Sequence, residues 1–454
     1  MTNRTEDPLY YFFDRFAEAS GLECAVFKST TWTYRDLLEE ISRDSQALAE
    51  YGISVGHVVG ITGQFHLRHL SLFFALARAG ATIVPLPGIE ELEANQRAEI
   101  ANATHLVRVT QEGHWALRAT GSVVSHHLLT RLLERREGGL IVFSSGSAGG
   151  KKAILHSMPK LLGKFQMRRK GYRTLAFLKL DHLGGINTLL HALSNSGMIV
   201  FPRNRGVDDI CKLIQDYTIQ LLPVTPTFLK LLLLSGSYLL YNLASLRLIT
   251  YGTEVMPEQA LKQLCEAFPA CKFQQTYGLS ELGVFRSKSR ASDSLWVKVG
   301  GESYETRVIG ETLWVRSRCA MEGYLNYESP FLEGGWFNTG DRVEVDGEFV
   351  RFLGRESDMI NVGGEKVSPI EVENFLLHLT DVKDVIVSAE PNLLLGNIVV
   401  AQIVLATNVP DADALRRIRM ACHRGLPRFM VPARIYFVSH LEYSDRYKRV
   451  RGVL

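Results

Sequence analysis

The first three-quarters of the chain alternates between helical and extended patterns, and this rhythm most constrains its fold. An amphipathic stretch at 33–52 is followed by an apolar run at 57–61, a helical stretch at 67–80 and another apolar run at 81–86. The same order returns between 197 and 234. The apolar runs are nearly unbroken, which is typical of strands buried on both faces. We therefore predict mostly parallel sheets covered by helices.

The pattern changes after about residue 295. Short extended segments with tight turns, at 311–317 and 342–354, predict a smaller antiparallel sheet or barrel. Beyond Gly354, a helix that begins at Ser368 is followed by two strands, a helix and a last strand. About 100 residues in this order can form an independent α+β domain. The expected fold class is α/β, with a large N-terminal region, a small β-barrel-like subdomain and a small C-terminal domain.

Composition excludes several classes of protein. The 454 residues allow two to four domain-sized units, and 46% hydrophobic and 22% charged residues are typical of soluble globular proteins. A net charge of +3 is too small to indicate a nucleic-acid or anionic membrane partner. The six cysteines include no CxxC pair, which suits reduced thiols. The polar N-terminus and the interrupted apolar run at 228–246 predict a cytoplasmic protein without a membrane span.

A glycine- and serine-rich loop with two lysines, "SSGSAGGKK" at 144–152, follows an apolar run at 140–143. Its open backbone N–H groups, hydroxyls and cations are suited to a polyphosphate, although a flexible surface loop would have a similar composition. The loop does not fit the P-loop pattern, because Ser145 and Lys152 stand where glycine and a hydroxyl residue are needed. A P-loop hydrolase or a kinase is thereby disfavoured.

Four further motifs follow the loop. They are "QTYGLSELG" (275–283), "WFNTGD" (336–341), "FLGRESDMINVGGEKVSPIEVEN" (352–374) and "LPRFMVPARIYFVSHLEYSDRYKRVR" (426–451). In this order, the five motifs resemble those of the adenylate-forming (AMP-binding) enzymes: acyl-CoA synthetases, luciferases and peptide-synthetase adenylation domains. The likeness is greatest to acyl- or aryl-CoA ligases. Departures from the family's motifs include Ala148, Lys151 and Ala153 in the loop and Glu442 and Tyr447, which replace a proline and a glycine.

The resemblance implies a two-step ligase. A carboxylic acid attacks ATP to give an acyl-adenylate and pyrophosphate, and a thiol then takes the acyl group, with Mg²⁺ assisting. Coenzyme A is the expected thiol, while a phosphopantetheinyl carrier protein or an amine stays open as the acceptor. Another alternative is a degenerate relative that uses acyl-AMP without making it. The acid itself is not specified, although bulky Tyr251 hints at a short or aromatic one.

The resemblance also implies a role for individual residues. Lys448 is the catalytic cation that bridges the carboxylate and the α-phosphate, and Glu281 is the Mg²⁺ ligand. Tyr277 lies against adenine, and Asp341 and Arg355 reach the ribose. The complete set expected to bind ATP is Ser144, Ser145, Gly146, Ser147, Gly149, Lys152, Thr253, Glu254, Tyr277, Gly278, Ser280, Asp341 and Arg355.

The remaining assignments concern the acid, the thiol and the hinge. His182, Tyr251 and Gly252 are expected at the acid substrate, and His182 is either catalytic there or a structural histidine. Gly363 and Gly364 are expected to let the pantetheine arm approach, because glycine exposes the backbone. The family's hinge falls at Ser357. It divides the chain into a large adenylation domain, 1–355, and a small mobile domain, 356–454, that carries Lys448.

Overall fold

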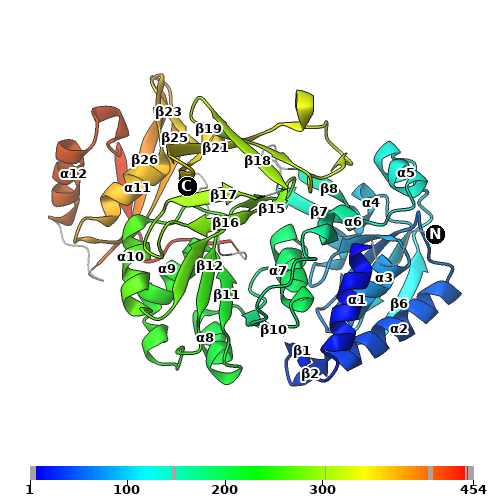
Figure 1. Cartoon of the computed structure of the whole chain (residues 1–454). Coiled ribbons are helices and arrows are strands. Elements are labelled where there is room, and N and C mark those ends of the chain that lie inside the picture. Colours follow the sequence, from blue (N-terminus) through cyan, green and yellow to red (C-terminus); the bar gives the residue numbers. More distant parts are fainter. Residues whose placement is uncertain (1–6, 146–149, 302, 407–412, 445–446, 448–454) are drawn as a thin grey trace.

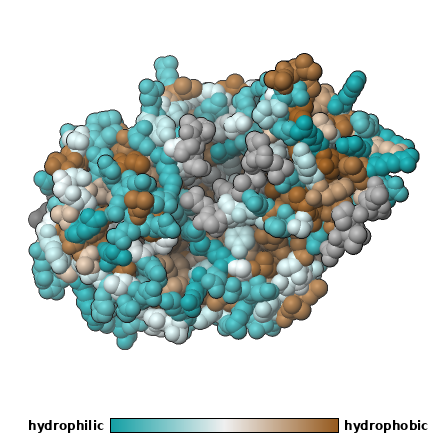
Figure 2. Space-filling model, turned by 180° about the vertical axis from the view of Figure 1, so that it is seen from behind, coloured by the Kyte–Doolittle hydropathy of each residue, from teal (hydrophilic) through white to brown (hydrophobic). Residues whose placement is uncertain are grey.

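The computed structural model describes every residue except 1–6, 146–149, 302, 407–412, 445–446 and 448–454. A large body holds most of the chain, and a smaller body, coloured orange to red in Figure 1, lies at one side of it. The face seen in Figure 2 is mainly hydrophilic, with hydrophobic residues interspersed. No helix in the described part of the chain is long and apolar enough to cross a membrane.

Two seven-stranded sheets of the described residues build the large body. One has the order β20 (Gly323–Tyr324), β8 (Lys151–Ser157), β7 (Gly139–Ser145), β4 (Thr82–Pro85), β3 (Val58–Gly63), β5 (His105–Val109) and β6 (Trp115–Ala119). The other has the order β13 (Lys272–Gln275), β12 (Leu248–Tyr251), β11 (Leu221–Val224), β9 (Arg173–Leu175), β10 (Met198–Phe201), β1 (Glu23–Phe27) and β2 (Thr30–Thr33). The neighbours from β13 to β1, and those from β7 to β5, run parallel, which confirms the predicted architecture.

Helices cover both sheets. They are α1 (Pro8–Glu18), α2 (Tyr34–Glu50), α3 (Arg68–Arg78), α4 (Glu91–Ile100), α5 (His127–Glu134), α6 (Met158–Gly163), α7 (Leu183–Ser194), α8 (Val207–Asp216), α9 (Pro226–Ser235) and α10 (Glu258–Ala267). The expected cap of α2 is present, because Thr33 and Asp36 form a capping box. The apolar run at 228–246 lies in α9, a left-handed Gly236 and the short 3₁₀ segment η1 (Ser237–Leu239).

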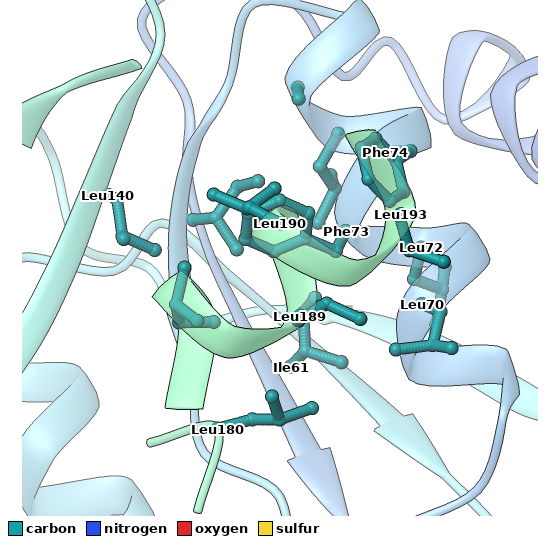
Figure 3. Close-up of a cluster of buried hydrophobic side chains, with 14 of the residues drawn as sticks. Ile61, Leu70, Leu72, Phe73, Phe74, Leu140, Leu180, Leu189, Leu190 and Leu193 are labelled. Atoms are coloured by element: carbon teal, nitrogen blue, oxygen red, sulfur yellow. The ribbon is translucent and has the colours of Figure 1, made fainter. Parts of the chain in front are cut away.

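The main core lies between the two sheets. In Figure 3, Leu70, Leu72, Phe73 and Phe74 of α3 face Leu189, Leu190 and Leu193 of α7. The same cluster includes Ile61 of β3 and Ile199 of β10, one from each sheet. Burial of these side chains is the main favourable term for holding two sheets against the same helices. This packing fixes the position of α7, whose first turn lies at the site described below.

A third, antiparallel sheet follows. Its strands are β16 (Arg286–Ser289), β17 (Val297–Gly300), β22 (Phe349–Arg355), β21 (Phe337–Asp346), β19 (Thr312–Ser317) and β18 (Tyr304–Ile309), in that order. It has a core of its own, which includes Leu313, Val315 and Val343. A two-stranded ribbon of β14 (Gly278–Leu279) and β15 (Gly283–Val284) precedes it.

The smaller body begins after β22, with the 3₁₀ segment η3 (Glu356–Asp358). It contains β23 (Ile360–Val362), β24 (Glu365–Val367), α11 (Pro369–Leu377), β25 (Val382–Asn392), β26 (Gly396–Leu405), α12 (Ala414–Gly425) and β27 (Arg434–Phe437). The five strands form one sheet with a separate hydrophobic core. Ser368 caps α11 by accepting a hydrogen bond from the Glu371 N–H, as the sequence predicts.

A buried ion pair joins the two bodies. Lys230 of α9 donates to Asp384 of β25, and both side chains are less than a tenth exposed. Tyr443 donates to the other Asp384 oxygen at 2.6 Å. The Lys230–Asp384 bond therefore helps to set the orientation of the smaller body, and Tyr443, from the smaller body itself, holds the Asp384 carboxylate in place.

A second lysine joins α6, α7 and β15. The Lys164 Nζ donates to Asn187 Oδ1 at 2.6 Å and to the carbonyl oxygen of Val284 at 3.3 Å. Both acceptors are neutral, and burial lowers the pKa of Lys164 to about 8. A cation held by neutral acceptors costs free energy while it stays protonated, so this lysine makes stability depend on pH.

We predict the sign of this dependence for Lys164→Met. The folded protein binds this proton more weakly than the unfolded chain, whose lysine has its ordinary pKa of about 10.5. The contribution of Lys164 to stability is therefore least favourable below pH 8 and improves as the pH rises toward 10.5. The unfolding free energy of the variant minus that of the wild type should fall by up to about 3 kcal/mol between pH 7 and pH 10.5.

Denaturant titrations at four pH values measure this difference. Lys164→Gln is the matched control, since it is equally uncharged but can still donate to the two acceptors. It should follow the same pH profile as the Met variant, with a constant offset. A difference that stays flat across the pH range would contradict the assigned cause.

Candidate active site

The carboxyl ends of β11, β12 and β13 lie at one edge of their parallel sheet. Three threonines follow these strands, Thr225, Thr253 and Thr276, and all three line cavities at this edge. In open α/β sheets, ligands bind outside the carboxyl ends of the strands. Thr253 has φ +73°, in the left-handed region that is uncommon for a β-branched residue.

Two cavities adjoin one another there. The larger, about 630 Å³, lies where the sheet edge meets the antiparallel sheet and the smaller body. The smaller, about 250 Å³, lies between the same edge and the start of α7. They share the wall formed by Thr253 and 276–279. One molecule can therefore extend from one cavity into the other along this shared wall.

A buried carboxylate organises the larger cavity. Asp341 of β21 accepts a hydrogen bond from the Tyr277 hydroxyl at 2.6 Å and another from Arg355 Nε at 3.1 Å. Burial raises the pKa of Asp341, while Arg355 and Tyr277 act against this rise. The three residues come from β21, β22 and the segment after β13, so this junction brings together the residues expected at the nucleotide.

The Tyr277 ring has aromatic neighbours of its own. It stacks with Phe285 and Phe352, at centroid distances of 5.2 and 4.5 Å. The residue is only 9% exposed and lines both cavities. Burial is also the main reason why the pKa of its hydroxyl lies well above the usual value, so the group stays a neutral donor to Asp341.

Glu281 and Lys152 meet at one tyrosine. The Tyr324 hydroxyl donates to Glu281 Oε1 at 2.8 Å, and Lys152 Nζ lies 5.1 Å from the Tyr324 ring centroid. The pairing of β20 with β8 places Tyr324 opposite Ile154. Sequence reasoning missed Tyr324, because nothing in its local sequence indicates this partner strand.

Glu281 alone was expected to hold Mg²⁺, and its surroundings fit that expectation. Magnesium usually takes one or two carboxylates, with substrate phosphates and waters completing its coordination. Tyr324 occupies one carboxylate oxygen and leaves Oε2 for a metal. Within the part of the chain that the structure describes, no three metal-binding side chains gather into a complete protein cage.

The loop at 144–152 is only partly described. Gly146, Ser147 and Gly149, which were expected to bind ATP, lie outside the described residues. Ser144 lines the smaller cavity, and Ser145 ends β7.

The remaining ATP candidates also lie at this edge. Gly278 lines both cavities, Ser280 lines the smaller one and Glu254 lines the larger. The Glu254 carboxylate accepts a hydrogen bond from the Thr227 hydroxyl at 2.7 Å. The Ser280 carbonyl oxygen lies 2.7 Å from His156 Nε2.

A chain of charged residues runs from the loop to the smaller cavity. Lys151 pairs with Glu93, which also accepts from Arg97 at 2.7 Å. Arg97 and Asp181 are each 4% exposed, with Arg97 Nη1 3.4 Å from Asp181 Oδ2. The same carboxylate oxygen lies 3.6 Å from His182 Nε2. Sequence reasoning missed Arg97, which is the single arginine of an otherwise ordinary polar helix, α4.

The structure places only one of the three acid-binding candidates at a cavity. His182 lines the smaller cavity, and its Nδ1 lies 3.1 Å from the Phe143 carbonyl oxygen. Tyr251 is 1% exposed within a hydrophobic core, away from the lining of both cavities. Gly252 lies behind Thr276, where an added Cβ would come within 2.5 Å of the Thr276 carbonyl oxygen. Gly252 thus permits close packing, whereas Tyr251 is a core residue.

Gly363 and Gly364 form the two-residue turn between β23 and β24. Their φ values are +61° and +96°, so this tight hairpin itself favours glycine at both positions. Ser357 is exposed in η3 and lines the larger cavity. Lys448 lies outside the described residues, but its neighbour Tyr447 is described and lines the smaller cavity.

Comparisons with known proteins agree with this arrangement. The family described as AMP-binding enzyme matches residues 12–325, and its C-terminal domain matches 371–445. A 2-succinylbenzoate–CoA ligase from Bacillus pumilus is 25% identical, covering 92% of this chain and 91% of that protein. An indoleacetate–CoA ligase from Aromatoleum aromaticum is 26% identical, covering 95% and 94%.

Solved structures share the fold. An anthranilate CoA ligase bound to anthranoyl-AMP superposes with a TM-score of 0.81 at 20% identity, covering 98% of this chain and 95% of that one. An amide bond synthetase from Marinactinospora thermotolerans gives 0.79 at 20% identity, covering 97% of each chain. The family match spans more than half of the chain, and it confirms the family and fold predicted from the motifs. The chain belongs to the AMP-binding enzyme family of adenylate-forming ligases.

Proposed function

We propose that this enzyme joins a small carboxylic acid to coenzyme A through an acyl-adenylate. The observation that carries the proposal is the pair of adjoining cavities with a shared wall at 276–279. The larger has the buried Asp341 junction that suits a ribose, and the smaller has His182 and an apolar lining that suits an organic acid. The CoA-ligase names of the two relatives support coenzyme A as the thiol.

In the first step, a carboxylate oxygen of the acid attacks the α-phosphorus of ATP. A P–O bond forms, the bond to the β-phosphate oxygen breaks, and pyrophosphate leaves with the electron pair. Asp341 accepts hydrogen bonds from the ribose hydroxyls, while Arg355 and Tyr277 hold its carboxylate in position. Lys448 offsets repulsion between the two anions and stabilises charge at phosphorus.

Glu281 would hold Mg²⁺ through Oε2. When bound, the metal supplies Lewis-acid neutralisation of the phosphate charge. Lys152, whose Nζ lies near the ring of Tyr324, adds a protein cation near the same place.

In the second step, a thiol attacks the acyl carbon and AMP leaves. We propose that residues 356–454 rotate about Ser357 between the two steps, and that the turn at Gly363 then faces the thiol. The rotation would separate Lys230 from Asp384, the buried pair that joins the two bodies. Coenzyme A serves as the acceptor here, whereas a carrier protein or an amine would need a different surface at the second step. The cytoplasmic location expected from the sequence stays a prediction.

The first test is product identity. With ATP, Mg²⁺, coenzyme A and a panel of aryl and short acids, the enzyme should release AMP and pyrophosphate. Glu281→Gln should lower acid-dependent pyrophosphate exchange by about 10²–10³-fold, because one charged ligand to the metal is lost. Glu333→Gln, at an exposed acid in the 3₁₀ segment η2 (Glu333–Gly335), is the control and should keep wild-type exchange. ADP and inorganic phosphate as products would contradict the proposal.

The second test separates the two half-reactions. Lys448→Ala should lower acyl-AMP formation by about 10²–10³-fold and spare thioester formation from supplied acyl-AMP. Gly363→Asn should do the reverse, since asparagine tolerates φ +61° and adds a side chain without breaking the turn. Equal losses in both half-reactions would refute the alternating domain. A wild type that consumes acyl-AMP but shows no exchange would favour the degenerate relative.

A further inference from the structure

Tyr447 comes from the C-terminal part of the chain but is held by the large body. Its hydroxyl donates to the carbonyl oxygen of Arg205, and its own carbonyl oxygen accepts from the Thr225 hydroxyl at 2.9 Å. Its ring lies 5.3 Å from Phe177 and 5.5 Å from Phe228, centroid to centroid. Four partners from the large body therefore hold this one residue, three through its side chain and one through its backbone.

The backbone at this position favours glycine. Tyr447 has φ +53°, in the left-handed region, where a bulky side chain is a genuine outlier. The motif at 426–451 resembles one in which glycine occupies this position, so the conformation matches the motif while the side chain does not. A strained residue kept against the backbone preference indicates that the side chain has a use.

Tyr447 lines the smaller cavity. Tyr447 and Phe177 line it together with Thr225 and His182. Phe228 lies behind them, fully buried in the core of the sheet with β11 and β12. The cavity of about 250 Å³ is thus bounded on one side by a residue that the large body alone does not supply. An apolar cavity of about 150 Å³ holds benzene, so this volume suits one ring bearing a carboxylate.

We infer that Tyr447 is a specificity-determining residue that supplies one wall of the acid pocket and limits the acid to about one aromatic ring. This inference rests on the proposed function, because it takes the smaller cavity as the acid site. Lys448, the proposed cation of the adenylation step, is the next residue in the chain. We therefore assign the wall formed by Tyr447 to the domain orientation in which adenylation takes place. The enzyme therefore selects the acid by size during adenylate formation. Tyr447 then moves away from the cavity with the C-terminal domain before the thiol reacts.

Tyr447→Gly tests the inference, because glycine removes the wall and suits φ +53°. Acid-dependent pyrophosphate exchange is measured with benzoate, 2-naphthoate and biphenyl-4-carboxylate. The ratio of kcat/KM for the larger acids to that for benzoate should rise by at least about 10-fold, the discrimination that a pocket gains from modest differences in size. Tyr447→Phe keeps the ring and loses only the bond to Arg205, so it should keep the wild-type ratios.

A uniform loss with all three acids in Tyr447→Gly, with unchanged ratios, would overturn the inference and leave Tyr447 as an anchor of the C-terminal part. Tyr447→Asn also suits the left-handed backbone and gives a second small variant if the glycine variant does not fold. Direct binding of non-reactive acyl-sulfamoyl adenosines carrying the same three acyl groups repeats the comparison without turnover. Absence of exchange in the wild type would then count against the proposed function alone, while the affinity ratios still decide the role of Tyr447.

Discussion

The contact on which the site depends is the one between the buried Asp341 carboxylate and its two donors. Tyr277 follows the last strand of one parallel sheet, Asp341 lies in the antiparallel sheet, and Arg355 ends that sheet immediately before the smaller body. The register of β21 against β22 places Asp341 directly opposite Arg355. Without its donors this carboxylate would be buried and uncompensated, which is costly. The same contacts that satisfy it also align the parallel sheet and the antiparallel sheet around the larger cavity.

The contacts that hold the smaller body define its orientation without strongly stabilising it. The Lys230–Asp384 pair is buried, and a buried pair recovers much of its Coulombic loss when its charges regain water. It therefore specifies an orientation without making that orientation much more stable than a separated one. Tyr447 adds aromatic packing against Phe177 and Phe228, at the cost of a strained backbone. Directional but weakly favourable contacts suit the domain rotation proposed above.

The fold could largely be predicted from the sequence, and so could the residues that meet at the Asp341 junction. Unbroken apolar runs give buried parallel strands, and short motifs with fixed spacing located Tyr277, Asp341 and Arg355. The surroundings of the smaller cavity and of Glu281 could not be predicted, because the residues there act through partners far away in the chain. Asn187 lines the smaller cavity and is oriented by Lys164, while Tyr324 reaches Glu281 only through strand pairing. Such contacts depend on packing and leave no local pattern.

Tyr251 and the two glycines show the opposite difficulty. Tyr251 was expected at the acid substrate because it is a bulky residue just before Gly252, but the alternation of β12 points it into the core, where it is 1% exposed. Gly363 and Gly364 are expected from the sequence to let the pantetheine arm approach, although a two-residue hairpin turn by itself already favours glycine at both positions. One residue type at one position can satisfy two constraints, and sequence alone does not separate them.

The departures from the family's motifs are better explained as adaptations than as decay. Lys151, in place of proline, pairs with Glu93 and so joins the charged chain that leads through Arg97 to Asp181. Tyr447, in place of glycine, has four partners in the large body and a position in the cavity wall. A residue that drifts after loss of function has no reason to join a charged network that continues into the buried Arg97–Asp181 pair, or to hold a disfavoured backbone. Both departures alter the surroundings of the smaller cavity while leaving the Asp341 junction complete, which is the pattern expected when selection changes the acid and keeps the adenylate chemistry.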